Sequence, residues 1–108
     1  MSDITKRAMD YIKAHYQEDL TLPQLAAEVN MSQYHFSRVF KKECGYSPYK
    51  YIMLIRMNQA MYLLQSTDLS VKQVAQAVGY HSQATFSTAF SSRSGLSPTK
   101  FRAYLPVS

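Results

Sequence analysis

A group of side chains suited to nucleic-acid recognition recurs at helical spacing between residues 34 and 42. The group comprises Tyr34, Ser37, Arg38, Lys41 and Lys42. At 100° per residue, its tyrosine, serine, arginine and first lysine fall on one side of a helix, and two phenylalanines fall on the other. Arginine pairs with the acceptors of guanine, serine is a short donor and acceptor, and lysine contacts phosphate. The set fits a helix that enters a DNA major groove, and a merely solvated helix face is the alternative.

A second set lies about fifty residues later and carries no charge. It comprises Gln83, Ala84, Thr85, Ser87 and Thr88. A solvated helix face normally carries lysine and glutamate, so a small neutral face favours close approach to another macromolecule. Glutamine can read adenine, and the methyl groups of alanine and threonine can contact thymine methyls. A protein-binding helix would look similar, and that alternative stays open.

No constellation typical of catalysis or metal binding accompanies these sets. The three histidines, His15, His35 and His81, do not follow a zinc-ligand spacing. The single cysteine, Cys44, excludes an internal disulfide and a multi-cysteine zinc site, and we expect a small, buried or half-buried thiol. Because no nucleophile, base and orienting group stand in a recognisable pattern, we expect no enzyme activity, no metal and no cofactor.

Length and charge narrow the class of protein further. The chain has 108 residues, with 12 Lys and Arg against 7 Asp and Glu, a formal charge of +5. This size fits one domain, and the basic balance favours an anionic partner such as nucleic acid. No window approaches the roughly 18 apolar residues of a membrane span, and no secretory signal is visible. We therefore expect a soluble, cytoplasmic domain that does not bind membranes.

An internal repeat indicates which elements position the two polar sets. Gln24, Ala26 and Val29 recur 49 residues later, whereas Ser32 and the motif residues that follow it recur 50 residues later. The shift implies one inserted residue near residues 80 and 81, which we place in a tight turn, where insertions cost least.

Each repeat contains the start and stop signals of a helix-turn-helix. The pairs Thr21/Gln24 and Ser70/Gln73 are predicted capping boxes at the starts of helices 22–29 and 71–78. Asn30 and Gly79 are predicted to end these helices in the left-handed conformation. Ser32 and Ser82 are then predicted to cap the second helices, which end at Gly45 and Gly95.

The remaining segments complete an all-α fold of about seven helices. We predict a first helix over 3–17, a linker helix over 48–65 and a short closing helix over 98–104. The expected architecture is two three-helix lobes joined by the linker helix. Lobe one spans 3–47 with its helix-turn-helix at 22–44, and lobe two spans 66–104 with its helix-turn-helix at 71–93.

These motifs together resemble the DNA-binding domain of the AraC/XylS family of bacterial transcription regulators. Residues 74–90 read Val-Ala-x-x-Val-Gly-Tyr-x-Ser-Gln-x-x-Phe-Ser-x-x-Phe, and residues 95–102 read Gly-x-Ser-Pro-x-x-Phe-Arg. Residues 51–64 resemble the linker helix of that family, and the likeness covers residues 4–104. The whole chain, 1–108, would then be one AraC-type domain, either a small complete protein or the carboxyl-terminal part of a longer regulator.

The resemblance implies sequence-specific binding to double-stranded DNA in transcription control, more often activation than repression. Each lobe would insert its second helix into one of two adjacent major grooves, about one turn (~34 Å) apart, as a monomer on DNA. By position, Tyr34, Ser37 and Arg38 would read bases in one half-site, and the set from residue 83 to residue 88 would read the other. The resemblance implies a structural role for Arg56.

Two differences from the family pattern, together with the charge distribution, suggest that the two lobes contact DNA in different ways. Many members of the AraC/XylS family carry arginine at the position of Thr88 and basic residues at the positions of Ser91 and Ser92. Residues 55–108 nevertheless hold 5 basic and 1 acidic side chains. Phosphate contacts in lobe two are therefore expected from scaffold residues away from its neutral groove-facing set, namely Lys72, Arg93, Lys100 and Arg102. We expect guanine readout in lobe one, and phosphate anchoring with apolar or shape readout in lobe two. The opposing hypothesis is a protein-interaction module that docks RNA polymerase or a regulatory domain.

Overall fold

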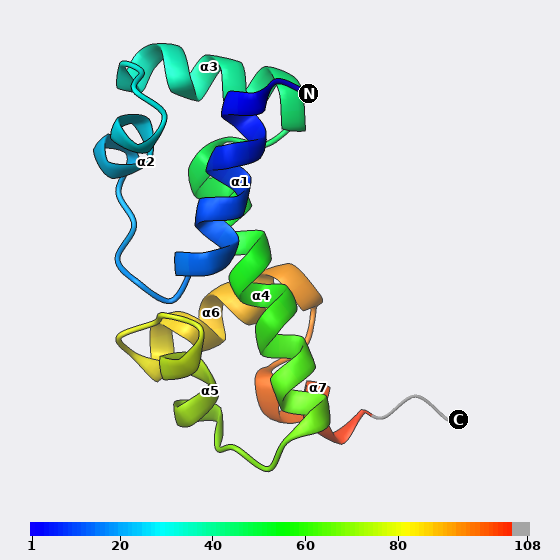
Figure 1. Cartoon of the computed structure of the whole chain (residues 1–108). Helices are drawn as coiled ribbons and strands as arrows, with labels where there is room; N and C mark the ends of the chain where they lie inside the picture. Colours follow the sequence, from blue (N-terminus) through cyan, green and yellow to red (C-terminus); the bar gives the residue numbers. More distant parts are fainter. Residues whose placement is uncertain (105–108) are drawn as a thin grey trace. The chain divides into compact units, whose positions relative to one another are not determined.

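Helices are the only regular secondary structure in residues 1–104, the part of the chain that the computed structural model describes (Figure 1). The seven helices within that part are α1 (Asp3–His15), α2 (Leu22–Glu28), α3 (Gln33–Cys44), α4 (Pro48–Ser66), α5 (Val71–Ala77), α6 (Gln83–Ser94) and α7 (Pro98–Ala103). The predicted all-α class is confirmed.

The chain divides into two compact units, and the boundary falls inside α4. The first unit runs to Ile55, and the second begins at Arg56. Each unit therefore contains one helix-turn-helix together with part of the linker helix. The first unit holds α1, α2 and α3, and the second holds α5, α6 and α7.

In the first unit, α1 and α2 both pack against α3 around one apolar core (Figure 1). The core residues are Ala8, Ile12, Leu25, Ala26, Val29, Phe36, Phe40 and Ile52. Tyr51 of α4 packs edge-on against Phe40, with 5.6 Å between ring centroids. Burial of a large apolar side chain contributes about 1.5–3 kcal/mol, so this cluster fixes which face of α3 points outward.

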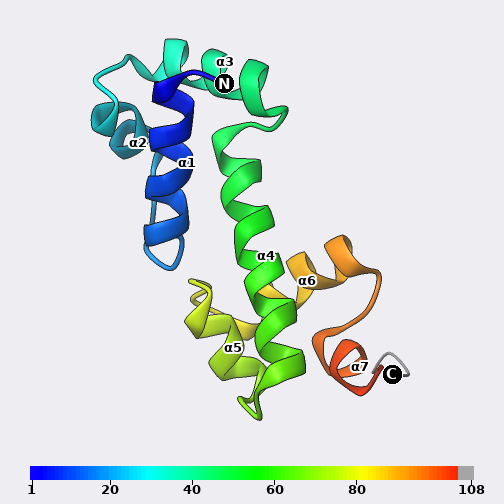
Figure 2. The same cartoon turned by 45° about the vertical axis from the view of Figure 1, so that its right-hand side comes forward.

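The second unit repeats this arrangement with α5, α6, α7 and the second part of α4 (Figure 2). Its buried apolar residues are Met57, Ala60, Leu64, Val74, Ala75, Val78, Phe86 and Phe90. Phe101 of α7 packs edge-on against Phe90 at 5.2 Å, as Tyr51 does against Phe40. The sequence repeat is therefore a repeat of the core contacts.

The helix boundaries follow the predicted capping signals. Both capping boxes form, and the hydroxyls of Ser32 and Ser82 accept the N–H groups of His35 and Thr85. The turn after α2 contains Asn30 at φ 56°, and the turn after α5 contains Gly79 at φ 100°. The turn spans residues 29–32 in the first unit and 78–82 in the second, so the predicted insertion does lie in the turn.

Three details of the fold differ from the sequence-based expectations. Helix α1 ends at His15, two residues before the predicted end, and its core-facing side includes the fully buried Thr5. Val39 and Ala89, which helical spacing places on the same side as the buried phenylalanines, are only half-buried. Both lie at the edge of the buried stripe, because two phenylalanines one turn apart already fill the space beneath each helix.

A carboxylate at the end of α3 joins that helix to the start of α1. Glu43 Oε1 accepts the Ser2 hydroxyl at 2.6 Å and the Ser2 backbone N–H at 3.0 Å. The Ser2 hydroxyl also caps α1 by accepting the N–H of Thr5 at 3.4 Å. The hydroxyl of Ser2, then that of Thr5, then the N–H of Ser2 lower the pKa of Glu43 from its ordinary 4.5 to about 2.

This lowered pKa predicts how stability depends on pH. Because the pKa of Glu43 is lower in the folded chain, its contribution is complete above about pH 4.5 and is lost as pH falls toward 2. We expect the Glu43→Gln variant to unfold at lower urea concentration than the parent at pH 7, with the difference shrinking between pH 4.5 and pH 2. In a Ser2→Ala background the same substitution should have a smaller effect. A difference that stayed constant over this pH range would contradict the assignment.

Candidate nucleic-acid interface

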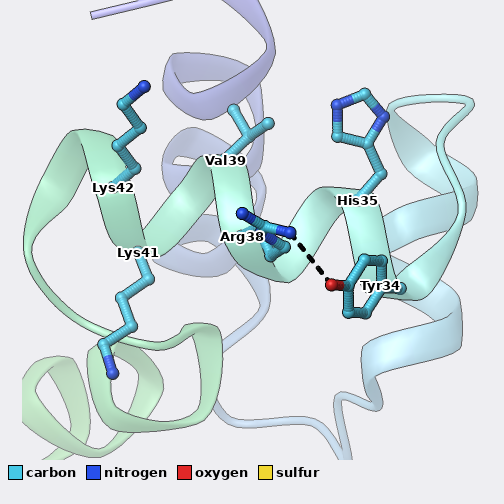
Figure 3. A pocket seen from close by; sticks show the side chains of 6 residues that line it. All are labelled: Tyr34, His35, Arg38, Val39, Lys41 and Lys42. Carbon is cyan, nitrogen blue, oxygen red and sulfur yellow. Dashed lines mark hydrogen bonds between the residues drawn. The ribbon is translucent and has the colours of Figure 1, made fainter.

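The outward face of α3 carries the first predicted set of site residues (Figure 3). Tyr34 is 71% exposed. Arg38, Lys41 and Lys42 are also exposed, and Ser37 is half-buried. On the opposite side, Phe36 and Phe40 are fully buried. The structure therefore brings the five residues together on one helix. Four of them are exposed, whereas Ser37 lines a hollow with Leu25 and Ile52 of the core.

Two rows of side chains border a surface hollow of about 570 Å³ along α3. One row holds Tyr34, Arg38 and Lys41, and the other holds His35, Val39 and Lys42 (Figure 3). The rows follow from spacings of four and three residues, which place side chains on successive turns of one helix. Three of the six lining residues are permanently cationic and none is acidic, so the hollow attracts anions.

Arg38 is held in place by Tyr34. Its Nη1 donates to the Tyr34 hydroxyl at 2.9 Å, drawn as the dashed line in Figure 3. Its Cζ also lies 5.5 Å from the centroid of the same ring, within the range of a cation–π interaction. The guanidinium therefore has a defined direction on the surface rather than a free one.

The second predicted set lies on α6 in the second unit. Gln83, Ala84, Thr85 and Thr88 are exposed, and Ser87 is half-buried. The Thr85 hydroxyl accepts the Ser82 hydroxyl at 3.0 Å within the helix cap. Phe86 and Phe90 are fully buried beneath this face. The face of α6 thus matches that of α3 in geometry and differs from it in charge.

A polar hollow lies beside the start of α6, and the sequence did not predict it. It has a volume of about 320 Å³, and Lys72, Gln76, His81 and Gln83 are among its lining residues. The repeat contains the signal, because Pro23, Ala27 and Met31 occupy the matching positions in the first copy. Three positions that are apolar in the first copy are therefore polar in the second. Two of these, Lys72 and His81, have basic side chains.

Two arginines of the second unit are committed to the fold. Arg102, expected among the phosphate contacts, donates from Nε to the Leu64 carbonyl at 3.0 Å and from Nη2 to the Thr67 carbonyl at 3.3 Å. These carbonyls lie at the end of α4, where the intrahelical partners run out. Arg56 stacks on the Tyr80 ring, with Cζ 5.5 Å from the centroid. Arg102 is therefore better explained as a helix-end ligand than as a phosphate contact.

Other candidate groups show no metal site and no membrane span within the described residues. No group of three or more His, Cys, Asp or Glu side chains there lies close enough to hold a metal ion. No helix in residues 1–104 is long and apolar enough to cross a bilayer. Cys44 is half-buried, and its Sγ donates to the Tyr46 carbonyl at 3.3 Å. Ser94 makes the matching contact to Leu96 in the second unit.

Comparisons with known proteins agree with this geometry. A family model described as a helix-turn-helix domain matches residues 25–104. The lactose operon transcription activator of Staphylococcus xylosus is 31% identical over 102 residues, covering 94% of this chain and 37% of that protein. The chain spans about a third of the length of the curated relatives it matches.

Two solved structures are similar over nearly the whole chain. The carboxyl-terminal domain of AraT, a response regulator from Geobacillus stearothermophilus, has a TM-score of 0.94 and 41% identity, covering 99% of this chain and 89% of that one. The DNA-binding domain of AdpA, in complex with a target DNA, has a TM-score of 0.89 and 31% identity, covering 94% and 92%. The chain belongs to the AraC-type helix-turn-helix family, a family of transcription regulators rather than enzymes.

The role of Arg102 gives a prediction about stability. Arg102→Ala removes two charge-assisted hydrogen bonds to part-buried carbonyls, so we expect it to lower the free energy of unfolding by about 1–3 kcal/mol. Lys100→Ala, on the exposed side of the same helix α7, should stay within about 0.5 kcal/mol of the parent. Urea unfolding of both variants at one pH measures the difference. Equal, small effects would mean that Arg102 is free for another role.

Proposed function

We propose that this chain is a sequence-specific, double-stranded DNA-binding domain that acts in bacterial transcription regulation, with α3 and α6 each entering a major groove. The observation that carries the proposal is the exposed, basic face of α3, locked outward by the buried Phe36 and Phe40. An α-helix with such a face has the width and the donors that a major groove accepts. Membership of the AraC-type family supports the same function.

In the first unit we assign direct base readout and phosphate contact to α3. Arg38 is suited to guanine O6 and N7, with Ser37 as a short donor and acceptor beside it. Lys41 and Lys42, on the later turns of the helix, would contact backbone phosphates. Tyr34 supplies a hydroxyl and a ring on the same face.

In the second unit we assign base and shape readout to α6. Gln83 is suited to adenine, and the methyl groups of Ala84 and Thr85 are suited to thymine. Ser87 and Thr88 add short polar groups. Because the face itself is uncharged, phosphate anchoring would come from residues around it: Lys72 in the hollow beside α6, Arg93 and Lys100. The DNA site would then have two parts of different character.

The rest of the proposal concerns the setting in which the domain acts. A net charge of +5 is modest, so specific contacts must supply much of the affinity, and non-specific binding should be weak and salt-sensitive. We infer that the domain works by binding rather than catalysis, without a cofactor, in the cytoplasm, and as a monomer on DNA. Activation is favoured over repression, because the relative in Staphylococcus xylosus is an activator.

One observation favours a second candidate function. The outward residues of α6 are small and uncharged, which also suits a protein partner such as RNA polymerase or a regulatory domain. In that case α3 would bind DNA alone, or the whole scaffold would act as a docking module. The two functions differ in whether α6 contributes to DNA sequence preference.

Selection from a random oligonucleotide pool separates the two functions. We expect the chain to enrich a two-part motif at moderate salt, with one part guanine-rich and the other richer in adenine and thymine. Replacement of Gln83 and Thr88 by alanine should erase preference in the second part only. Enrichment of one part alone would favour the protein-docking role for α6. No enrichment at all would overturn the proposed function.

Single substitutions on α3 test the distinction between base and phosphate contacts. Arg38→Ala should cost about 1–3 kcal/mol of binding free energy and relax preference at one base pair, because it removes a base contact. Lys41→Ala should weaken binding to all sequences alike and reduce the salt dependence, because it removes a phosphate contact. Fluorescence anisotropy titrations at several salt concentrations measure both quantities. An unchanged affinity and preference in Arg38→Ala would refute the groove assignment of α3.

A further inference from the structure

We propose that Tyr34 is a positioning residue for Arg38, which fixes the guanidinium in the direction required for guanine and so sharpens the base preference of the first unit. This inference rests on the proposed DNA-binding function. It assigns Tyr34 a role that acts through Arg38, in place of a base contact of its own.

The geometry of the pair carries the inference. Tyr34 and Arg38 are four residues apart on α3, so their side chains leave the same face on successive turns. The hydroxyl accepts from Arg38 Nη1 at 2.9 Å, and the ring lies 5.5 Å from Cζ. Both contacts come from one side chain and restrain the same guanidinium (Figure 3). An exposed arginine otherwise samples many rotamers, and a bound one must give them up.

The restraint leaves Arg38 able to bind a base. A guanidinium has five N–H donors in a planar fork, and the tyrosine hydroxyl takes one of them. The second N–H of Nη1, both of Nη2 and that of Nε remain for the two acceptors of a guanine edge. The contact with Tyr34 can therefore persist in the complex.

The location of the pair fits readout rather than general anchoring. Both residues lie in the first half of α3 (Gln33–Cys44), and the early residues of a recognition helix are those that meet base edges. Lys41 and Lys42 lie in the last turn of α3, away from these early positions. Fifty residues later the matching positions hold Ala84 and Thr88. The pairing of a tyrosine with an arginine on the second helix therefore occurs in the first unit and not at the matching positions of the second.

The test is a double-mutant cycle on DNA that carries the selected site. Tyr34→Phe keeps the ring and removes the hydroxyl that accepts from Arg38. We expect it to weaken binding to the site by about 3-fold to 10-fold, which is the usual cost of losing preorganisation of one long side chain. Binding to sites altered at the base pair read by Arg38 should change much less, so that preference at this base pair falls. In an Arg38→Ala background, Tyr34→Phe should have little effect.

A matched control separates this role from the general loss of a surface hydroxyl. Tyr49 of the same unit is 72% exposed, against 71% for Tyr34, and it lies outside α3. Tyr49→Phe should leave preference at the base pair read by Arg38 unchanged. A second measurement uses the free chain: NMR relaxation of the Arg38 Nε–Hε group should show greater motion on the picosecond to nanosecond timescale in Tyr34→Phe and unchanged motion in Tyr49→Phe.

The outcomes distinguish this inference from the proposed function. If the parent chain selects a DNA site but Tyr34→Phe keeps the full preference of the parent, the positioning role is wrong and DNA binding stands. If Tyr34→Phe weakens binding equally in the parent and in Arg38→Ala, Tyr34 contacts DNA directly and the positioning role is again wrong. If the parent selects no site, the proposed function fails first, and this inference fails with it.

Discussion

The burial of two phenylalanines one turn apart on each second helix is the constraint on which the rest of the structure depends. Phe36 and Phe40, like Phe86 and Phe90, are fully buried, with ring centroids 5.6 Å and 5.7 Å apart. Replacing a buried phenylalanine by alanine typically costs about 3–5 kcal/mol, so each helix has one favourable rotation about its axis. That rotation decides which residues face outward. The chemistry of both faces therefore depends on residues that never reach a ligand.

The capping groups determine where these helices begin, and so which residues lie in their first turns. Ser32 and Ser82 accept the N–H groups of His35 and Thr85, and left-handed residues precede them in the turns. If either helix began one residue earlier, its serine would lie inside the helix and no longer cap it, and the fold would lose about 1 kcal/mol of stability. Tyr34 and Gln83 thereby occupy the exposed early positions of α3 and α6. Caps and cores act together to present the two faces.

Local chemistry made most of this fold predictable from sequence. Capping boxes, turn residues and helical spacing act over fewer than five residues, so Thr21/Gln24 and Ser70/Gln73 were assigned correctly. The features that the sequence did not predict depend on contacts between distant segments. The Glu43 and Ser2 pair joins residues 41 apart, and Arg102 reaches Leu64 across 38. A single sequence carries no signal for such partners, so Arg102 looked like a phosphate contact. The hollow lined by Lys72 and His81 is visible in the sequence only as a difference between the two copies of the repeat.

The two copies differ mainly where the core imposes no requirement. Arg38, Lys41 and Lys42 of the first copy correspond to Thr88, Ser91 and Ser92 of the second, while the phenylalanines are unchanged. Exposed substitutions of this kind usually change stability by less than about 0.5 kcal/mol, so the faces can diverge without altering the fold. The second copy instead has Lys72 and His81 where the first has Pro23 and Met31.

In the second copy, permanent positive charge therefore lies beside the helix face, on Lys72, and not on the face itself. Under the proposed function, the first unit uses one helix, α3, both to read bases and to contact phosphates. The second unit separates the two tasks: its neutral face can approach base edges closely, while charge around it holds the phosphates. A neutral face reads through shape and methyl contacts, which depend on close fit rather than on long-range attraction. Salt should accordingly affect the affinity contributed by the second unit more than its sequence preference.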